Sequence, residues 1–247
     1  MYIKNLELKN GLPKICIPLI AKNKEELKTE INTLKDIYYD LIEWRIDHYE
    51  KVEEESELLE ALELIRQELP DCVLLVTFRT IYEGGNTITK RYADIYRGLI
   101  KTHQIDLIDV EFSRGDELFT EILKLSHHHH VGVIASYHDF SQTPSKKEMM
   151  ACFEKMKTLQ ADIFKLAVMP KSIEDVLALL EVTYKANKLF TQPIITMSMS
   201  KLGFITRATG ELFGSAVTFG SGKEASAPGQ ISAEQLRQLL LLMHEGL

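Results

Sequence analysis

Short apolar runs alternate with longer stretches of helical period along this chain. The apolar runs lie at 15–20, 41–47, 72–79, 105–111, 131–138, 163–169, 193–199 and 215–220. Runs of this length, with large or β-branched residues on both faces, are typical of buried parallel strands. Between them, apolar residues recur three and four positions apart, which predicts amphipathic helices near 29–37, 57–65, 90–103, 116–126, 145–159, 172–187 and 232–244.

Eight strands alternating with helices predict a (β/α)8 TIM barrel, which is an α/β fold. An open, doubly wound sheet is the alternative, but it more often has about five or six strands and a glycine-rich first turn, which this chain lacks. No shift in composition divides the 247 residues, so we expect one barrel domain over 1–247. Residues 1–13 alternate in polarity and reach Asn10-Gly11, a turn signal that predicts a short N-terminal β-hairpin.

The apolar run at 163–169 carries a lysine, Lys165, in its middle. Burying an ammonium is costly, so such a lysine either reaches solvent at the strand end or stays inside as a partly free amine. A free amine can attack a ketone and form a Schiff base. The strand alone leaves both interpretations open.

Side chains alternate between the two faces of a strand, so residues two apart share a face. Ionisable and hydroxyl side chains recur on one face of the second to sixth strands: Glu43, Arg45 and Asp47; Thr77 and Arg79; Asp109 and Glu111; Ser136 and His138; and Lys165. In a barrel this face points inward, and most of these residues lie toward the carboxyl ends of their strands, where barrel enzymes build their sites. Because burying charge without purpose is costly, the pattern favours one functional cavity.

Charge and cysteine usage limit the partners of the protein. A net charge of -7 without a basic stripe argues against a nucleic-acid partner, although a few arginines in a cleft can still bind an anionic substrate. No apolar run approaches about 18 residues, and the N-terminus lacks the apolar core of a signal peptide, so we expect a cytoplasmic protein with no membrane contact. Cys16, Cys72 and Cys152 are widely separated, which predicts reduced thiols.

Motifs over nearly the whole chain carry a family resemblance. They are Glu43-Trp44-Arg45-Ile46-Asp47, Thr77-Phe78-Arg79-Thr80 with Glu83-Gly84-Gly85, Asp109-Val110-Glu111, Ser136-Tyr137-His138-Asp139-Phe140, Phe164-Lys165-Leu166-Ala167, Met197-Ser198-Met199, the segment from Gly203 to Arg207, Thr218-Phe219-Gly220, and Ala225-Ser226-Ala227-Pro228-Gly229-Gln230. In this order and spacing, the set resembles type I 3-dehydroquinate dehydratase, the Schiff-base-forming dehydratase of the shikimate pathway.

The resemblance implies a lyase that removes water from 3-dehydroquinate to give 3-dehydroshikimate, in the biosynthesis of chorismate and aromatic amino acids. It implies that Lys165 is the Schiff-base lysine, His138 the general acid/base and Glu83 the carboxylate that orients the histidine. The substrate-binding positions that it implies are Glu43, Arg45, Arg79, Met197, Met199, Arg207, Phe219, Ser226, Ala227 and Gln230. It also implies no metal or organic cofactor, and a homodimer.

These residue types suit the implied chemistry. An iminium acts as an electron sink, and a histidine can take and return protons near neutral pH. An arginine fork pairs with both oxygens of a substrate carboxylate. We expect Arg207 in a loop after the seventh strand, between Gly203 and Gly210, from which it could reach over the site.

Three other signals carry no site. Pro18 stands in the first strand where many relatives have a small hydroxyl residue, so we leave it out of the site. The tract His127-His128-His129-His130 falls before the fifth strand, at the end of the barrel opposite the site, and adjacent residues rarely chelate one ion. The turn Gly220-Ser221-Gly222 is similar to a phosphate-binding turn but lacks a second glycine-rich loop after the seventh strand.

Two other functions remain open from the residues alone. A class I Schiff-base aldolase acting on a small keto acid would also use a barrel lysine, although it usually binds a phosphate. A catalytically idle barrel would be expected to have lost Lys165 or His138, and both are present.

Overall fold

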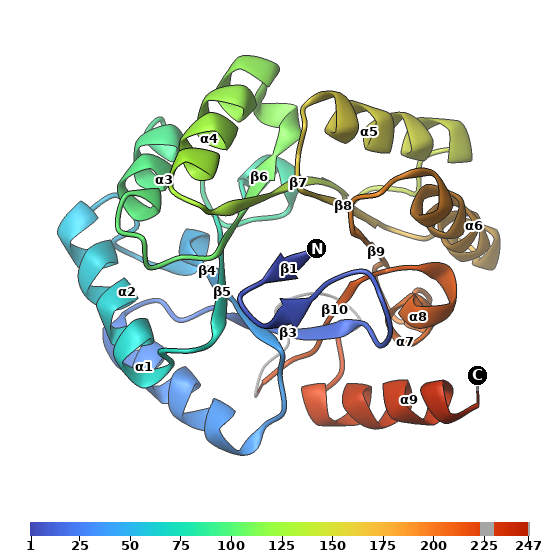
Figure 1. Ribbon diagram of the computed structural model, residues 1–247, viewed down its shortest axis with the longest axis horizontal. Helices are drawn as coiled ribbons and strands as arrows, with labels where there is room; N and C mark the ends of the chain where they lie inside the picture. Colours follow the sequence, from blue (N-terminus) through green and yellow to red (C-terminus); the bar gives the residue numbers. More distant parts are fainter. Residues whose placement is uncertain (223–229, 247) are drawn as a thin grey trace.

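The computed structural model describes residues 1–222 and 230–246, and it confirms the barrel. Eight parallel strands form one sheet in the order β10-β3-β4-β5-β6-β7-β8-β9. Their bounds are β3 Lys14–Leu19, β4 Leu41–Arg45, β5 Val73–Thr77, β6 Leu107–Glu111, β7 Gly132–Asp139, β8 Ile163–Val168, β9 Ile194–Ser198 and β10 Val217–Phe219. Figure 1 shows the strands curled into a ring, and Ala216 N donates to Ile194 O (2.7 Å) across the seam between β9 and β10.

Helices surround this ring on its outer side (Figure 1). They are α1 Lys24–Thr33, α2 Glu55–Glu68, α3 Tyr92–Ile100, α4 Asp116–His128, α5 Lys146–Thr158, α6 Ile173–Leu189, α7 Ile205–Ala208, α8 Gly210–Phe213 and α9 Ala233–Glu245. Short 3-10 turns, η1 Leu34–Asp36, η2 Ile46–His48, η3 Ile81–Glu83 and η4 Phe112–Arg114, interrupt the connections. The predicted helices all occur, but α1 begins earlier than expected because Asn23 caps it by accepting the N–H of Glu26.

Two apolar layers flank the sheet. The outer layer packs strand residues such as Trp44, Val76 and Phe164 against the helices. The inner layer fills the amino-terminal half of the barrel with residues such as Leu75, Leu107 and other buried side chains of the strands. The interior is therefore packed at one end, and only the carboxyl-terminal end is left for polar side chains.

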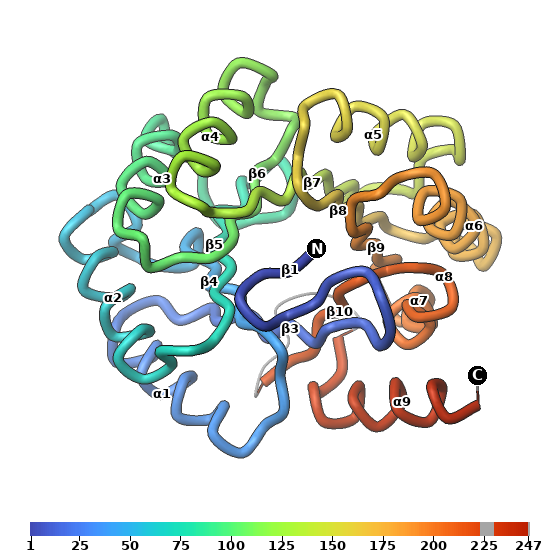
Figure 2. Tube along the Cα trace, in the orientation of Figure 1, coloured from blue at the N-terminus to red at the C-terminus, as the bar shows by residue number. Residues whose placement is uncertain are grey.

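The N-terminal hairpin closes the apolar end of the barrel. Strand β1 (Tyr2–Ile3) pairs antiparallel with β2 (Leu6–Glu7), and Leu8 is fully buried in the inner apolar layer. Figure 2 shows the N-terminus at the centre of the ring, whereas the C-terminus lies at the periphery. The hairpin is confirmed, but its turn lies at Lys4 and Asn5, where Lys4 has φ +50°, and the predicted turn Asn10-Gly11 belongs to the connection into β3.

A repeated hydrogen bond links neighbouring strands at this end of the barrel. Asp40, Asp106 and Asp162 directly precede β4, β6 and β8, and each accepts a backbone N–H of the preceding strand at 2.8 Å. Before β10 the equivalent acceptor is Ser215 Oγ, which receives the N–H of Thr196 at 3.0 Å. Because register fixes which side chains face inward, these bonds help to keep the polar residues of the strands on the inner face.

Pro18 is tolerated in β3 because its nitrogen needs no partner there. The backbone of Cys16 faces β10, because Cys16 O accepts the N–H of Gly220. The backbone nitrogen of Pro18, two residues further along, points to the same side. Strand β10 ends at Phe219, which pairs with Cys16, so the ladder does not reach Pro18.

Candidate active site

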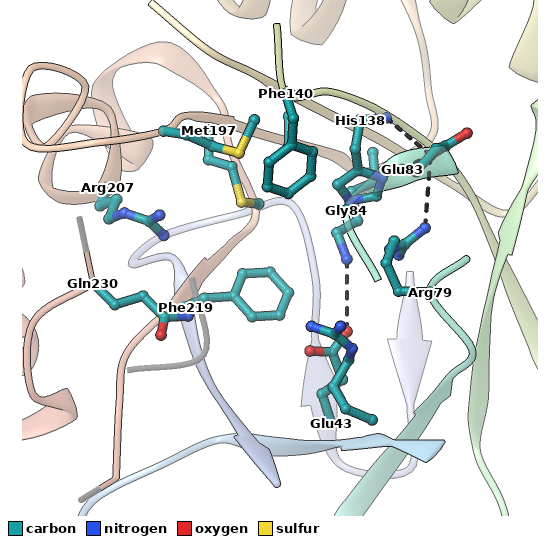
Figure 3. Close-up of a pocket in the computed structure, with 14 residues that line it drawn as sticks. Glu43, Arg79, Glu83, Gly84, His138, Phe140, Met197, Arg207, Phe219 and Gln230 are labelled. Carbon is teal, nitrogen blue, oxygen red and sulfur yellow. Dashed lines mark hydrogen bonds and ion pairs between the residues drawn. The ribbon is translucent and has the colours of Figure 1, made fainter. Parts of the chain in front are cut away.

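A cavity of ≈ 170 Å³ opens at the carboxyl-terminal end of the barrel. Its lining residues come from strands β4, β7, β8, β9 and β10, from the connections that follow strands, and from α7: Glu43, Arg45, Arg79, Glu83, Gly84, His138, Phe140, Lys165, Ala167, Met197, Met199, Arg207, Phe219 and Gln230. Figure 3 shows that Arg207 and Gln230 lie on one side of the cavity, whereas His138, Glu83 and Arg79 lie on the other. The structure thus brings together the described residues that the sequence assigned to a site.

Lys165 lies inside the cavity and is paired with carboxylates. Its side chain is 4% exposed, so the solvent-reaching interpretation of this strand is wrong. Its Nζ donates to Asp109 Oδ2 at 2.7 Å and lies 3.7 Å from Glu43 Oε1. It also lies 4.8 Å from the centre of the Phe219 ring, which adds a cation–π contact. The inner face predicted from strand parity is confirmed.

Asp109 connects this lysine to Arg79. The Asp109 Oδ1 atom accepts from Arg79 Nη2 at 2.6 Å and from Ser136 Oγ at 2.5 Å. Burial opposes the charge on Asp109, but Arg79 and Lys165 outweigh it and hold the pKa of this carboxyl well below its usual range. Asp109 is therefore a fixed anion between two buried cations.

Arg79 lines the cavity and also binds several side chains of a buried polar network. Its Nη1 donates to Glu111 Oε1 at 3.1 Å and to Ser136 Oγ at 3.0 Å, and it lies 3.7 Å from Glu83 Oε2. Glu111 in turn accepts the backbone N–H of Thr80 at 2.8 Å. Much of this guanidinium is thus engaged by the protein itself.

His138 and Glu83 form a hydrogen-bonded pair at the other end of this network. Glu83 Oε2 lies 2.9 Å from His138 Nδ1 and accepts the His138 backbone N–H at 3.0 Å, while Ser113 donates to the other carboxyl oxygen. Burial, with Arg79 and Lys165, lowers the pKa of His138 well below its usual value. Burial also raises the pKa of Glu83 to about 8, although Arg79 opposes the rise.

The state of Glu83 decides which ring nitrogen holds the proton. When the Glu83 carboxyl is protonated, the form that its raised pKa favours, it can donate to His138 Nδ1, which places the ring hydrogen on Nε2. When Glu83 is ionised, the ring donates from Nδ1 to the carboxylate, and Nε2 becomes an acceptor. The pair can therefore present either an acid or a base at Nε2.

Arg45 and Glu43 are held by neighbouring side chains. Arg45 makes a two-pronged ion pair with Asp47, with both N–O distances at 2.8 Å. Asp47 lies in η2 rather than in the strand, and it braces Arg45 instead of lining the cavity, which sequence parity did not foresee. Glu43 Oε1 accepts from Thr77 Oγ1 at 2.7 Å.

Arg207 reaches the cavity from a helix. It lies in α7 and is 2% exposed, so the expected loop position is wrong. Burial lowers its pKa to about 10, which leaves the guanidinium charged at neutral pH.

The remaining predicted residues complete the lining of the cavity. Met197, Met199 and Phe219 contribute apolar side chains, and Gln230 contributes a polar one. Ser226 and Ala227 lie outside the described residues.

Gly84, Phe140 and Ala167 also line the cavity, although sequence reasoning gave them no role. Gly84 has φ +82°, and a Cβ there would lie 2.3 Å from the Phe140 ring. Glycine is needed at this position both for the backbone and for the close approach of that ring. The Glu83-Gly84-Gly85 sequence was the signal for a tight turn beside the site.

The histidine tract lies away from this cavity, at the end of α4 and in the connection to β7. His127 contacts Asp162 at 3.0 Å, and His129 contacts His103 at 3.2 Å. Over residues 1–222 and 230–246, no three His, Cys, Asp or Glu side chains are grouped so that they could hold a metal ion. In the same part of the chain, no helix is both long and apolar enough to cross a membrane.

Comparison with known proteins gives one family for this chain. The model of the family described as "Type I 3-dehydroquinase" matches residues 15–246. The chain belongs to the type I 3-dehydroquinase family. This membership favours the dehydratase over the aldolase and the idle barrel.

Relatives in this family match over their full length. The 3-dehydroquinate dehydratase of Clostridioides difficile is 45% identical, with 100% of this chain and 98% of the relative covered. That of Escherichia coli O7:K1 is 42% identical, with 98% of each covered. A crystal structure of the type I enzyme from Clostridium difficile with covalently modified comenic acid has a TM-score of 0.97, covering 100% of this chain and 98% of the other.

The raised pKa of Glu83 predicts how stability depends on pH. Between the ordinary value of 4.5 and about 8, the native state holds a proton that the unfolded state has lost, so the free energy of unfolding falls as pH rises. Glu83→Gln mimics the protonated form and should lack this loss, which amounts to about 3–5 kcal/mol. Urea unfolding of both proteins from pH 4 to 9 measures the difference. A difference between them that stays constant over this range would contradict the assignment.

Proposed function

We propose that this protein is a 3-dehydroquinate dehydratase that works through a Schiff base on Lys165. The observation that carries the proposal is the buried Lys165 in a cavity that also holds the His138–Glu83 pair. Family membership supports the substrate, and the covalently modified ligand of the Clostridium difficile relative supports covalent chemistry. The reaction would serve the shikimate pathway, toward chorismate and aromatic amino acids, in the cytoplasm.

The first stage of the proposed reaction is imine formation. The Lys165 ammonium first gives up one proton, and the resulting amine attacks the ketone carbon of 3-dehydroquinate. That proton and a second N–H hydrogen leave with the carbonyl oxygen as water, which gives an iminium. Arg207, buried and charged on the side of the cavity opposite His138, is the proposed clamp for the substrate carboxylate. Glu43, Arg45 and Gln230 offer polar groups to the ring hydroxyls.

The second stage is elimination. His138 Nε2 takes the proton from the carbon next to the iminium, and the electron pair of that C–H bond moves toward nitrogen, giving an enamine. The enamine then expels the hydroxyl group, which His138 protonates so that it leaves as water. Water finally hydrolyses the product iminium and releases 3-dehydroshikimate and Lys165. Glu83 takes the Nδ1 proton of His138 when Nε2 becomes protonated, and it returns that proton when Nε2 protonates the leaving hydroxyl.

The covalent step predicts a specific adduct. Borohydride added with 3-dehydroquinate should reduce the imine, abolish activity and add the mass of one reduced ligand to the peptide that contains Lys165. The Lys165→Arg variant should gain no mass, whereas Lys185→Arg, changed at an exposed lysine on α6, should be labelled like the wild type. Loss of activity without a mass increase on Lys165 would refute the Schiff base.

The role of His138 predicts a separation of imine formation from turnover. His138→Ala should lower kcat by about 10²- to 10⁴-fold while borohydride still labels Lys165. His127→Ala, at the opposite end of the barrel, is the matched control and should keep normal kcat. Steady-state kinetics with mass spectrometry measures both. A kcat close to that of the wild type would show that another group moves the protons.

We also propose a homodimer formed by the outer face of α6. Ile173, Leu177 and Tyr184 are exposed along one stripe of this helix, because their spacing of four and seven returns to the same side. Exposed Leu212 on α8 extends the apolar surface, and α6 and α8 are neighbours in Figure 1. Several large exposed apolar side chains on neighbouring helices are typical of protein–protein interfaces.

Sedimentation of a single charge variant tests this dimer face. Leu177→Glu should raise the dimer dissociation constant at least tenfold, because it buries an unpaired carboxylate in the contact. Leu242→Glu, at an exposed leucine of α9, should remain dimeric. A monomeric wild type, or a dimer that tolerates Leu177→Glu, would exclude this interface.

A further inference from the structure

Asp109 is placed to do more than hold the barrel together. It is fully buried, and its two oxygens have separate tasks: Oδ1 binds Arg79 and Ser136, which leaves Oδ2 directed at Lys165 Nζ, 2.7 Å away. Glu43, the other carboxylate near the lysine, is 1.0 Å farther (3.7 against 2.7 Å) and is held by Thr77. Asp109 is therefore the contact anion of the reacting nitrogen.

The charge on this nitrogen is the same before and after imine formation. An ammonium and a ketone give an iminium and one water, because two N–H hydrogens leave with the carbonyl oxygen and the positive charge stays on nitrogen. Only the protonated imine is a strong electron sink, so the iminium must keep its last proton among buried side chains. An anion fixed beside the nitrogen raises the pKa of the iminium.

We propose that Asp109 is the counterion of the Lys165 iminium, and that Arg79 and Ser136 are positioning residues that aim its free oxygen. This inference rests on the Schiff base proposed above. Arg79 and Lys165 keep Asp109 ionised, so it stabilises the cation and does not itself remove the proton. Asp109 thus assists both iminium stages of the reaction, before and after loss of the hydroxyl.

Cyanoborohydride distinguishes this role because it reduces the protonated imine and spares the neutral one. With 3-dehydroquinate present, the trapping rate on Lys165 is measured against pH by mass spectrometry. The wild type should be trapped at a rate that stays high into alkaline pH. In Asp109→Asn the midpoint at which trapping fails should fall by about 1–3 pH units, the shift expected for loss of a neighbouring opposite charge.

Two further variants separate this effect from damage to the fold. Ser136→Ala removes one bond to Oδ1 and should shift the midpoint in the same direction by a smaller amount, which keeps the test available should Asp109→Asn not fold. Asp116→Asn, at an exposed carboxylate that starts the next helix, α4, and pairs with Lys155, should leave the midpoint unchanged. If no adduct forms in the wild type, the Schiff base itself fails. If the adduct forms but the midpoint of Asp109→Asn or Ser136→Ala equals that of the wild type, only the counterion role is refuted.

Discussion

The ion pair between Asp109 and Lys165 is the interaction on which the site depends. Neither charge could remain in the barrel alone, because desolvation of an unpaired ion costs several kcal/mol. Arg79 completes the arrangement, since its guanidinium holds Asp109 from the other side and joins it to Glu111 and Ser136. Lys165, the proposed Schiff-base lysine, is thus held as a paired cation, and its partner Asp109 also links neighbouring strands of the barrel.

The barrel can hold this buried ion pair because its interior is divided into two halves. The amino-terminal half is filled with apolar side chains and closed by the hairpin, so water reaches the polar half only from the other end. The acceptors before alternate strands, Asp40, Asp106 and Asp162, each bind a backbone N–H of the preceding strand and help to hold the register. In this register Ser136 pairs with Lys165 and Thr77 with Asp109, which brings the network together from neighbouring strands.

The fold and the inward-facing strand residues of the site could be predicted from the sequence because both depend on local periodicity, whereas Glu83, Arg207, Phe219 and Gln230 were assigned only through the family resemblance. Strand parity alone placed Lys165, Asp109 and Ser136 on the inner face, where the structure has them. What parity could not give was distance across the ring, such as the contact between Asp109 and Lys165. It also fails past the strand ends, as with Asp47 in its 3-10 turn and Arg207 in α7, since turns and short helices carry no alternating pattern.

The most direct measurement of the central claim is the ¹⁵N NMR signal of Lys165 Nζ in enzyme labelled at the lysine side-chain nitrogens and mixed with 3-dehydroquinate. A Schiff base beside an ionised Asp109 predicts a new signal in the range of protonated imines, coupled to one hydrogen and missing in Lys165→Arg. Ammonium signals alone during turnover would contradict the covalent mechanism. An imine nitrogen without a hydrogen at neutral pH would contradict the counterion.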